Sequence, residues 1–265
     1  MTYRFTVLGC GSSGGVPRIG MNWGACDSEN PKNRRLRCSA LVERMGPKGQ
    51  TAVLIDTSPD FRAQILAVRA TALDGVLFTH DHADHTHGID DLRMVSYAQK
   101  RRVEAYFDAK TGRSLQERFA YCFKTPQGSN YLPILNAHEI DGVTPFAISG
   151  PGGAIPVVPI PQTHGDITSL GFRFSNLAYS PDVSDISEAS AKLLEGLDVW
   201  VVDALRHTPH ESHFSVKDAL KWIARLKPKR AILTHMTGEL DYETLRRDLP
   251  PGVEPAYDGM QIGFS

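Results

Sequence analysis

Four of the ten histidines of this chain lie within eight residues, between His80 and His87. The segment also contains two aspartates. It follows a short apolar run, residues 75–78, whose flanking turn signals predict a buried strand. Side chains two positions apart in an extended segment point to the same side, so His80 and His82 can converge on one point. Two converging imidazoles form half of a metal site with nitrogen and oxygen ligands.

Asp84 and His85 follow after the chain has turned, where they can bind a second ion close to the first. Neutral imidazole and carboxylate suit Zn, Mn or Fe, and the segment has none of the thiolates that structural zinc prefers. A solvated polar loop is the alternative. However, this many histidines and aspartates are costly to bury unpaired, and protonated histidines would repel one another. The segment therefore predicts a centre for two divalent metal ions.

The pattern H-x-H-x-D-H, formed by His80, His82, Asp84 and His85, resembles the signature of the metallo-β-lactamase superfamily. The resemblance implies an α/β fold, the αββα four-layer sandwich, with the metals at the edge between two β-sheets. Strand-rich segments in both halves, each followed by helices, agree with two packed sheets covered by helices. Because we find no linker or internal repeat, we expect a single domain over residues 1–265.

The superfamily completes its site with a later histidine, an aspartate and a final histidine. Candidates for these occur in the same order, each near the end of a predicted strand. Singly, they could be core histidines and a turn aspartate, but the order favours ligands. The resemblance implies three ligands for each ion and one bridge: His80, His82 and His164; Asp84, His85 and His235; and Asp182. It further implies a shared hydroxide as nucleophile, and Asp56 as the acid that orients a ligand histidine.

Residues 203–215 follow a predicted strand and precede a predicted helix. Phosphodiesterases of the superfamily place a histidine here that protonates the leaving alkoxide, a role that suits the pKa of histidine near neutral pH. His213, at the start of the helix, is the candidate for this general acid, and His210 is the alternative. The expected catalytic residues are therefore His213 and Asp84, the latter also being a metal ligand.

Two features concern the branch of the superfamily. An aspartate bridge is typical of its phosphodiesterase, lactonase and thioesterase branches, whereas true β-lactamases often use a cysteine. Residues 8–17, with Trp23, Cys26 and Cys38, resemble the branch of the phosphoribosyl cyclic phosphate phosphodiesterase of bacterial phosphonate breakdown. At its start only, the chain also resembles the pyrroloquinoline-quinone synthesis protein B. The glycine- and serine-rich loop offers N–H groups to a phosphate, with a mere tight turn as the alternative.

One departure from that branch concerns a structural zinc, which the phosphonate-pathway enzyme holds with early cysteines and a histidine three residues after the last ligand. Here the early loop keeps only Cys26, and position 238 is Gly238. We therefore expect that this third metal is absent, which leaves the identity of the substrate open.

The expected function is a binuclear metal-dependent phosphodiesterase that hydrolyses a small nucleotide-like or sugar (cyclic) phosphate ester, with a nucleoside monophosphate as bound product. Alternatives are a tRNA 3′-processing-type nuclease, a lactonase or thioesterase, and a non-catalytic binding protein. Arg93 is a candidate for binding a phosphate oxygen or a carboxylate behind the ligands. Met21 and Trp23, in the long irregular loop 16–37, are candidates for a base or sugar pocket. Ordinary surface and core packing are the alternatives for all three.

Composition excludes several other classes. A net charge of −1 with 22 % charged residues lacks the basic excess of many nucleic-acid binders, and we find no extruded arm that would grip tRNA, so we expect no long nucleic acid. Without a membrane-spanning run or a signal peptide, we expect a cytoplasmic protein with no membrane partner. The four cysteines form no C-x-x-C pair, so structural disulfides are not expected. The sequence leaves open whether the protein forms a homodimer.

Overall fold

The structure is a computed structural model that describes residues 3–265. Its strands form two seven-stranded sheets. The first sheet contains, in spatial order, β14 (Gln261–Phe264), β1 (Tyr3–Gly9), β2 (Ser39–Gly46), β3 (Gly49–Ile55), β4 (Gly75–Leu77), β5 (Val103–Phe107) and β6 (Leu135–Glu139). The second contains β13 (Val253–Pro255), β12 (Arg230–Thr234), β11 (Val199–Asp203), β10 (Leu177–Ser180), β9 (Ile167–Phe174), β8 (Ile155–His164) and β7 (Phe146–Ile148).

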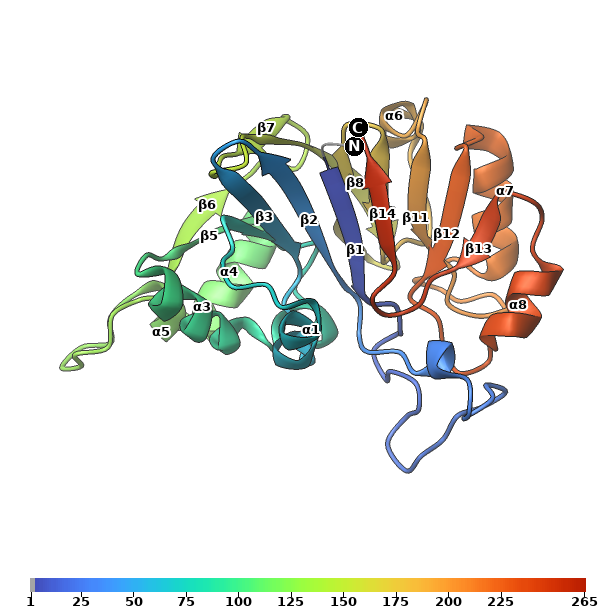
Figure 1. The fold of residues 1–265 in the computed structure, drawn as a ribbon, viewed down its shortest axis with the longest axis horizontal. Coiled ribbons are helices and arrows are strands. Elements are labelled where there is room, and N and C mark those ends of the chain that lie inside the picture. The colour runs from blue at the N-terminus through green and yellow to red at the C-terminus, as the bar shows by residue number, and fades with distance from the viewer. Residues whose placement is uncertain (1–2) are drawn as a thin grey trace.

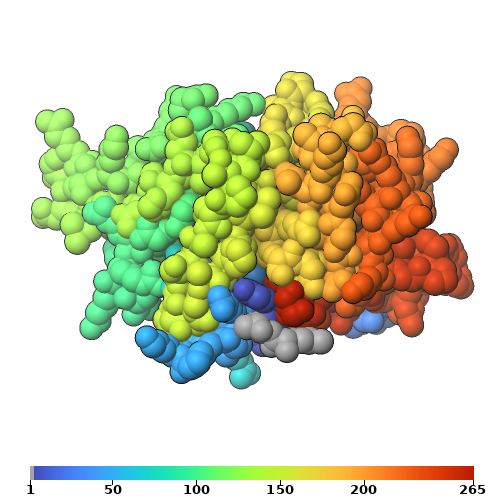
Figure 2. Space-filling view, turned by 90° about the horizontal axis from the view of Figure 1, so that it is seen from above, coloured from blue at the N-terminus to red at the C-terminus, as the bar shows by residue number. Residues whose placement is uncertain are grey.

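Helices cover the outer face of each sheet, so the layers are those of the expected αββα sandwich (Figure 1). The helices on the first sheet are α1 (Phe61–Val68), α2 (Ala83–Thr86), α3 (Leu92–Gln99), α4 (Ala109–Arg118) and α5 (Ala120–Phe123), with the 3-10 turn η2 (Ile89–Asp91). Those on the second are α6 (Glu188–Leu193), α7 (Val216–Leu226) and α8 (Tyr242–Asp248). Seen from above, the two halves of the chain lie on opposite sides, and the first and last strands meet between them (Figure 2).

Both sheets change from antiparallel to parallel pairing along their order. In the first, β14, β1, β2 and β3 pair antiparallel, and β3 to β6 pair parallel. In the second, β7 to β10 pair antiparallel, and β10 to β13 pair parallel. Parallel neighbours end at the same edge of a sheet. Loops that follow successive parallel strands therefore collect at one edge of the sandwich.

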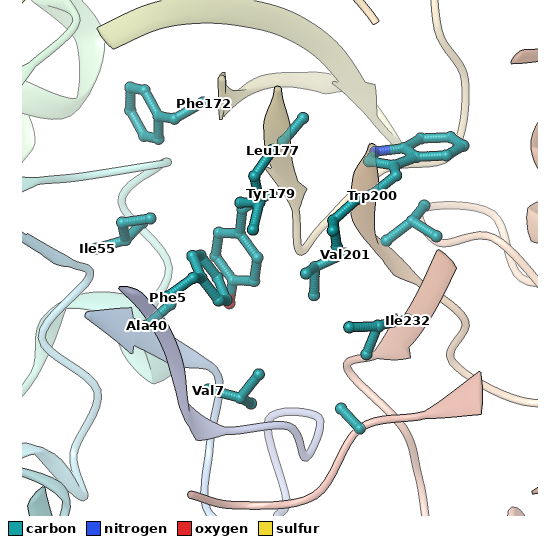
Figure 3. Close-up of a cluster of buried hydrophobic side chains, with 14 of the residues drawn as sticks. Phe5, Val7, Ala40, Ile55, Phe172, Leu177, Tyr179, Trp200, Val201 and Ile232 are labelled. Carbon is teal, nitrogen blue, oxygen red and sulfur yellow. The ribbon is translucent and has the colours of Figure 1, made fainter. Parts of the chain in front are cut away.

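The main core lies between the two sheets, where side chains from both inner faces meet (Figure 3). Phe5 on β1 packs against Tyr179 on β10 with ring centroids 5.5 Å apart, and Trp200 on β11 is fully buried. Each large apolar side chain buried in this way stabilises the sandwich by roughly 1.5–3 kcal/mol. A second cluster fills the space between the first sheet and helices α1, α3, α4 and α5. Two hydrophobic clusters, one between the sheets and one under the helices of the first sheet, therefore fix the strands whose ends carry these loops.

Several element boundaries differ from those expected from the sequence. The sequence predicts a helix from Pro59 with Ser58 as its N-cap, but α1 begins at Phe61 and its N-cap, Asp60, makes no side-chain capping bond. The sequence also misses α3 and the short strands β6, β7 and β13. The sequence predicts helices over Val216–Leu226 and Tyr242–Asp248, and these are the bounds of α7 and α8. In α7 the Ser215–Asp218 capping box accounts for the clear N-terminal signal.

Two irregular segments project from the body. Residues 16–37 contain only one short helical turn, η1 (Pro31–Asn33), and extend below the sheets, as the loop prediction implies (Figure 1). Residues 124–134, with Pro126 and Gly128, form a second projecting loop (Figure 1). Among residues 3–265, no helix combines the length and apolarity that crossing a bilayer requires.

Candidate metal centre

Every residue of the expected ligand set lies at or just after the end of a strand, at the shared edge of the two sheets. His80, His82, Asp84 and His85 follow β4 of the first sheet, while His164, Asp182 and His235 come from β8, β10 and β12 of the second. His164 is the last residue of β8 rather than a loop residue, because the β8–β9 hairpin extends to the pair His164–Ile167. The structure therefore brings all seven residues together, from segments more than 150 residues apart.

The seven residues form overlapping groups whose candidate ligand atoms all lie within 4.8 Å of one another. Two of these groups match the two expected ion sites: His80, His82 and His164; and Asp84, His85 and His235. Asp182 lies between them. Its Oδ2 is 3.1 Å from Nε2 of His85, and its Oδ1 is 3.4 Å from Nε2 of His235 and 3.8 Å from Nε2 of His164. Asp182 is therefore placed to serve both groups.

The ring nitrogens of this centre fit a bound cation. Nε2 of His80, His85 and His235 and Oδ2 of Asp182 are buried and have no hydrogen-bond partner among the residues that the structure describes. Buried polar atoms without partners are rare in folded proteins because each loses its bonds to water. Imidazole nitrogens and carboxylate oxygens pointing at one small volume are the donor set of a divalent metal, so the residues present fit such ions.

The electrostatics of the centre agree with this fit. Burial opposes a charge on Asp182, yet His235 and His85 hold the pKa of its carboxyl well below the usual range. Burial, together with the charge on His85, lowers the pKa of His80 well below its usual value. The carboxylate is thus held ionised and His80 neutral, which are the protonation states that bind metal ions.

Asp56 orients the centre from behind, as expected. Its Oδ2 accepts hydrogen bonds at 2.7 Å from Nδ1 of His85 and at 2.8 Å from the hydroxyl of Thr79. The Thr79 hydroxyl also lies 3.0 Å from Nδ1 of His80. Fixing Nδ1 of a histidine in this way directs its Nε2 toward the ions. Asp56 has a φ of 61°, a left-handed backbone conformation that is uncommon outside glycine and typical of functional sites.

His213 lies beside the metal centre, and its partner is a residue that the sequence does not single out. Its Nδ1 is 2.7 Å from Oδ2 of Asp203, the buried last residue of β11, and its ring stacks on that of His235 with centroids 4.5 Å apart. Asp203 in turn accepts a hydrogen bond from the backbone N–H of Val183. An imidazole that donates from Nδ1 leaves Nε2 free for proton transfer. His210 has no such carboxylate, and its Nδ1 accepts from the N–H of Ser212 at 3.2 Å.

The segment that carries His213 is joined to a ligand of the metal centre. Nδ1 of His164 donates to the backbone carbonyl of Ser212 at 2.6 Å. The ring of His213 also lies 4.7 Å from that of His164. The hydrogen bond fixes which nitrogen of His164 faces the centre, and it holds the chain just before His213. The acid candidate and the metal ligands are therefore positioned by one connected set of contacts.

The glycine- and serine-rich loop offers fewer backbone donors than its sequence indicates. The N–H of Cys10 donates to Asp258, that of Gly11 to Leu36 and that of Ser12 to Met236. The amides of residues 15 and 16 are also bonded within the protein. Only the two residues at the tip of the turn, Ser13 and Gly14, have N–H groups without an acceptor among residues 3–265. The loop is mainly a tight structural turn beside the centre.

A buried arginine, Arg35, lies between Cys26 and the segment around Gly238, where the related phosphonate-pathway enzyme holds its structural zinc. Nη1 of Arg35 donates to the carbonyl of Thr237 at 2.9 Å, and its Nη2 donates to that of Leu240 at 2.6 Å. The Cys26 thiol lies 3.9 Å from Nη1 of the same guanidinium and donates to the Leu240 carbonyl. The backbone of Gly238 receives the N–H of Ala25. A guanidinium beside the one retained thiol would repel a cation, which agrees with the expectation that no third metal binds here.

We expect Arg35→Met to lower the free energy of unfolding by about 3 kcal/mol, because two buried carbonyls lose a charged donor. Equilibrium urea unfolding followed by circular dichroism measures the change. Arg34→Met is the matched control, since the Arg34 side chain is exposed and stacks on Trp23; its effect should stay within about 0.5 kcal/mol. Equal losses for the two variants would contradict a fastening role for Arg35.

Three peripheral candidates are not placed against the metal ligands. Arg93 pairs with the exposed carboxylate of Asp90 at 2.5 Å and lies over the ring of Tyr131. These contacts match the alternative given above, an ordinary surface arginine. Met21 is 66 % exposed at the tip of the projecting loop, so it lines no pocket in this structure. Trp23 is half-buried, and its backbone lies against Gly238, three residues after His235. Only Trp23 comes near the edge of the centre.

Known proteins match this chain over nearly its full length. Residues 51–236 match the model of the beta-lactamase superfamily domain. The crystal structure of a new diphosphatase from the PhnP family is 36 % identical, with a TM-score of 0.89, covering 99 % of this chain and 98 % of that one. Zn²⁺-bound PqqB from Methylobacterium extorquens shares the fold, at 17 % identity and a TM-score of 0.74, over 98 % of this chain and all of that one.

An octanoyltransferase of Porphyromonas gingivalis is 32 % identical over 97 % of this chain but only 51 % of that protein. The chain thus spans about half the length of this curated relative. Taken with the site, the fold is the one that metal-dependent hydrolases of this type share. Within that class, the chain belongs to the metallo-β-lactamase superfamily and to its PhnP branch.

Proposed function

We propose that this protein is a binuclear metal-dependent phosphodiesterase that hydrolyses a small nucleotide-like or sugar phosphate ester, with a nucleoside monophosphate among its products. The observation that carries the proposal is the Asp203–His213 pair, 2.7 Å apart and in contact with the metal centre through His235. Esters with poor leaving groups require such a proton donor. We further propose that residues 1–265 act as a single domain, since residues of both sheets share one core.

In this proposal, His80, His82 and His164 would hold one ion, Asp84, His85 and His235 would hold the other, and Asp182 would serve both. When bound, two divalent ions supply positive charge to phosphoryl oxygens and activate a water molecule. Asp56 and Thr79 keep the ligand imidazoles in the orientation seen here. Five of the seven ligand residues are buried, whereas His82 is exposed and Asp84 is half-buried, so a substrate would approach the centre from the side of these two residues.

His213 then acts as the general acid. Its Nδ1–H remains bonded to Asp203, so its Nε2 carries the proton that is transferred to the leaving oxygen. Burial lowers the pKa of His213, which makes its protonated form a stronger acid. Asp203 is a positioning residue, because it holds the ring and does not reach the substrate.

The similar proteins support a substrate that contains phosphate. The match to the octanoyltransferase does not support acyl transfer by this chain. The PhnP-family neighbour acts as a diphosphatase, so the bond that it breaks lies at phosphorus. The octanoyltransferase is a longer protein of which this chain matches about half, and its activity is therefore not assigned to the matched half. We accordingly place the substrate among phosphate esters and diphosphates of small molecules.

A panel of substrates tests this proposal. Metal-loaded protein should hydrolyse bis(p-nitrophenyl) phosphate and nucleoside cyclic phosphates or p-nitrophenyl esters with a kcat/KM at least about 100-fold above that on octanoyl thioesters, acyl lactones and pre-tRNA. The measurement is initial rate by absorbance or product chromatography. Efficient turnover of pre-tRNA, a lactone or a thioester, with the phosphodiesters left intact, would show that the protein belongs to another reaction class.

A further inference from the structure

The turn at residues 12–15 has the geometry of an anion-binding element. The N–H of Gly15 donates to the carbonyl of Ser12 at 2.8 Å, which closes a β-turn with Ser13 and Gly14 as its central residues. Both central residues have negative φ, as a type I turn requires, and Gly15 follows at a φ of 61°. Both residues are exposed, and neither N–H has an acceptor within the described part of the chain.

An unpaired arginine lies directly over this turn. A Cβ atom added at Gly14 would be 3.2 Å from Cγ and 3.3 Å from Nε of Arg18, so the side chain of Arg18 lies close against the turn. Arg18 is exposed, and its guanidinium forms no ion pair or hydrogen bond with residues 3–265. By contrast, Arg37, near Gly15, is paired with Asp60 at 2.8 Å. Arg18 is therefore the free positive charge beside the two free amides.

The turn is fixed next to the metal centre. The N–H of Ser12 donates to the carbonyl of Met236, the residue after His235, and Gly11 forms a bridge to the same residue. Glu239 lines the same small hollow, of about 110 Å³, as Arg18 but makes no ion pair with it. Two neighbouring N–H groups without an acceptor and a guanidinium close to them are donors that suit the oxygens of a phosphoryl group.

We propose that the N–H groups of Ser13 and Gly14 and the guanidinium of Arg18 form a subsite for a second phosphoryl group, adjacent to the one that reacts at the metal centre. This inference rests on the proposed function and narrows the substrate to compounds with two neighbouring phosphoryl groups, such as nucleoside diphosphates. In this arrangement the reacting phosphoryl group would bind at the metal centre, and the other would bind the turn at residues 12–15 and Arg18.

The test measures discrimination between ADP, supplied as its non-hydrolysable α,β-methylene analogue and called ADP below, and AMP by isothermal titration calorimetry on the metal-loaded protein. Wild-type protein should bind ADP at least about 10-fold more tightly than AMP, because only ADP reaches both places. Arg18→Gln should reduce this ratio about 10-fold, and Arg18→Lys should restore part of it. Arg34→Gln, which removes an exposed charge from the same loop, should leave the ratio unchanged.

Two variants at position 13 separate the backbone donor from the side chain. Ser13→Pro removes the N–H, and proline suits the first central position of a type I turn, so the turn itself is kept. Ser13→Ala keeps the N–H and removes the hydroxyl. We expect the ADP/AMP ratio to fall with proline and to be largely retained with alanine. Equal ratios in wild-type and Arg18→Gln protein, or equal losses for both Ser13 variants, would overturn the subsite.

The outcomes also separate this inference from the proposed function. Hydrolysis of bis(p-nitrophenyl) phosphate, which has one phosphoryl group, tests the proposed function alone. Protein that cleaves this ester but binds ADP and AMP equally would overturn the subsite and leave the phosphodiesterase proposal standing. Protein that prefers ADP in the Arg18-dependent way but cleaves no phosphate ester would support the subsite and contradict the proposed reaction.

Discussion

His213→Ala should lower kcat by about 10²–10⁴-fold for phosphodiesters whose leaving group is an alkoxide, because the leaving oxygen loses its proton donor. Substrates with a p-nitrophenolate leaving group, which departs without a proton, should lose far less. The comparison of kcat for the two leaving groups, at equal metal content, measures the effect. Asp203→Asn should reproduce part of the loss, since it removes the carboxylate that holds Nδ1 of His213.

His210→Ala is the matched control, because its ring lies only 5.2 Å from that of His213 but lacks a carboxylate partner. This variant should retain most of the alkoxide activity. A larger loss for His210→Ala than for His213→Ala would transfer the acid role to His210. Equal losses on both types of leaving group, or a loss of bound metal, would show that His213 supports the centre rather than donating a proton.

The second large effect concerns metal content. Protein reconstituted with Zn or Mn should contain about two ions per chain by elemental analysis, and Asp84→Ala should contain about one, because Asp84 belongs to only one of the two ligand groups. Removal of the ions with a chelator should abolish hydrolysis, and adding Zn or Mn back should restore it.

Asp90→Ala is the control for this measurement, since Asp90 is an exposed aspartate paired with Arg93. It should keep about two ions per chain. A content near one ion in the wild-type protein, unchanged in Asp84→Ala, would contradict the binuclear assignment. Asp182→Ala should lose more metal than Asp84→Ala, because Asp182 lies within reach of both groups.

The sequence predicts the candidate metal ligands, which the structure brings together, because their signal is local. The H-x-H-x-D-H spacing is complete within six residues, and the later ligands each stand where an apolar strand ends. Asp203 also ends an apolar strand, but alone it resembles any polar residue after a buried run. Its role depends on His213, ten residues later, folding back to within 2.7 Å. Only the tertiary structure shows this contact.

Loop conformation was harder to predict, because it depends on partners far along the chain. The sequence predicts free amides in the glycine- and serine-rich loop, but Leu36, Met236 and Asp258 accept most of them. Arg35 belongs to a short basic run, residues 34–37, of a kind that usually lies on the surface. However, its side chain is 1 % exposed, because it donates to backbone carbonyls of residues 237 and 240. Short strands such as β7 and β13 also escape detection, since three residues carry too little periodicity.

The division of the ligands between the two sheets has a consequence for the lifetime of the protein. Four of the proposed ligands belong to the first sheet and three to the second, so each ion would gain its full ligand set only while the two halves of the chain stay docked. Free energy of metal binding then becomes free energy of cohesion between the halves, about 2.7 kcal/mol at an ion concentration 100-fold above the dissociation constant. In a metal-starved cell the sandwich should loosen first at this edge, so ion supply would set how long the protein survives proteolysis as well as how fast it works.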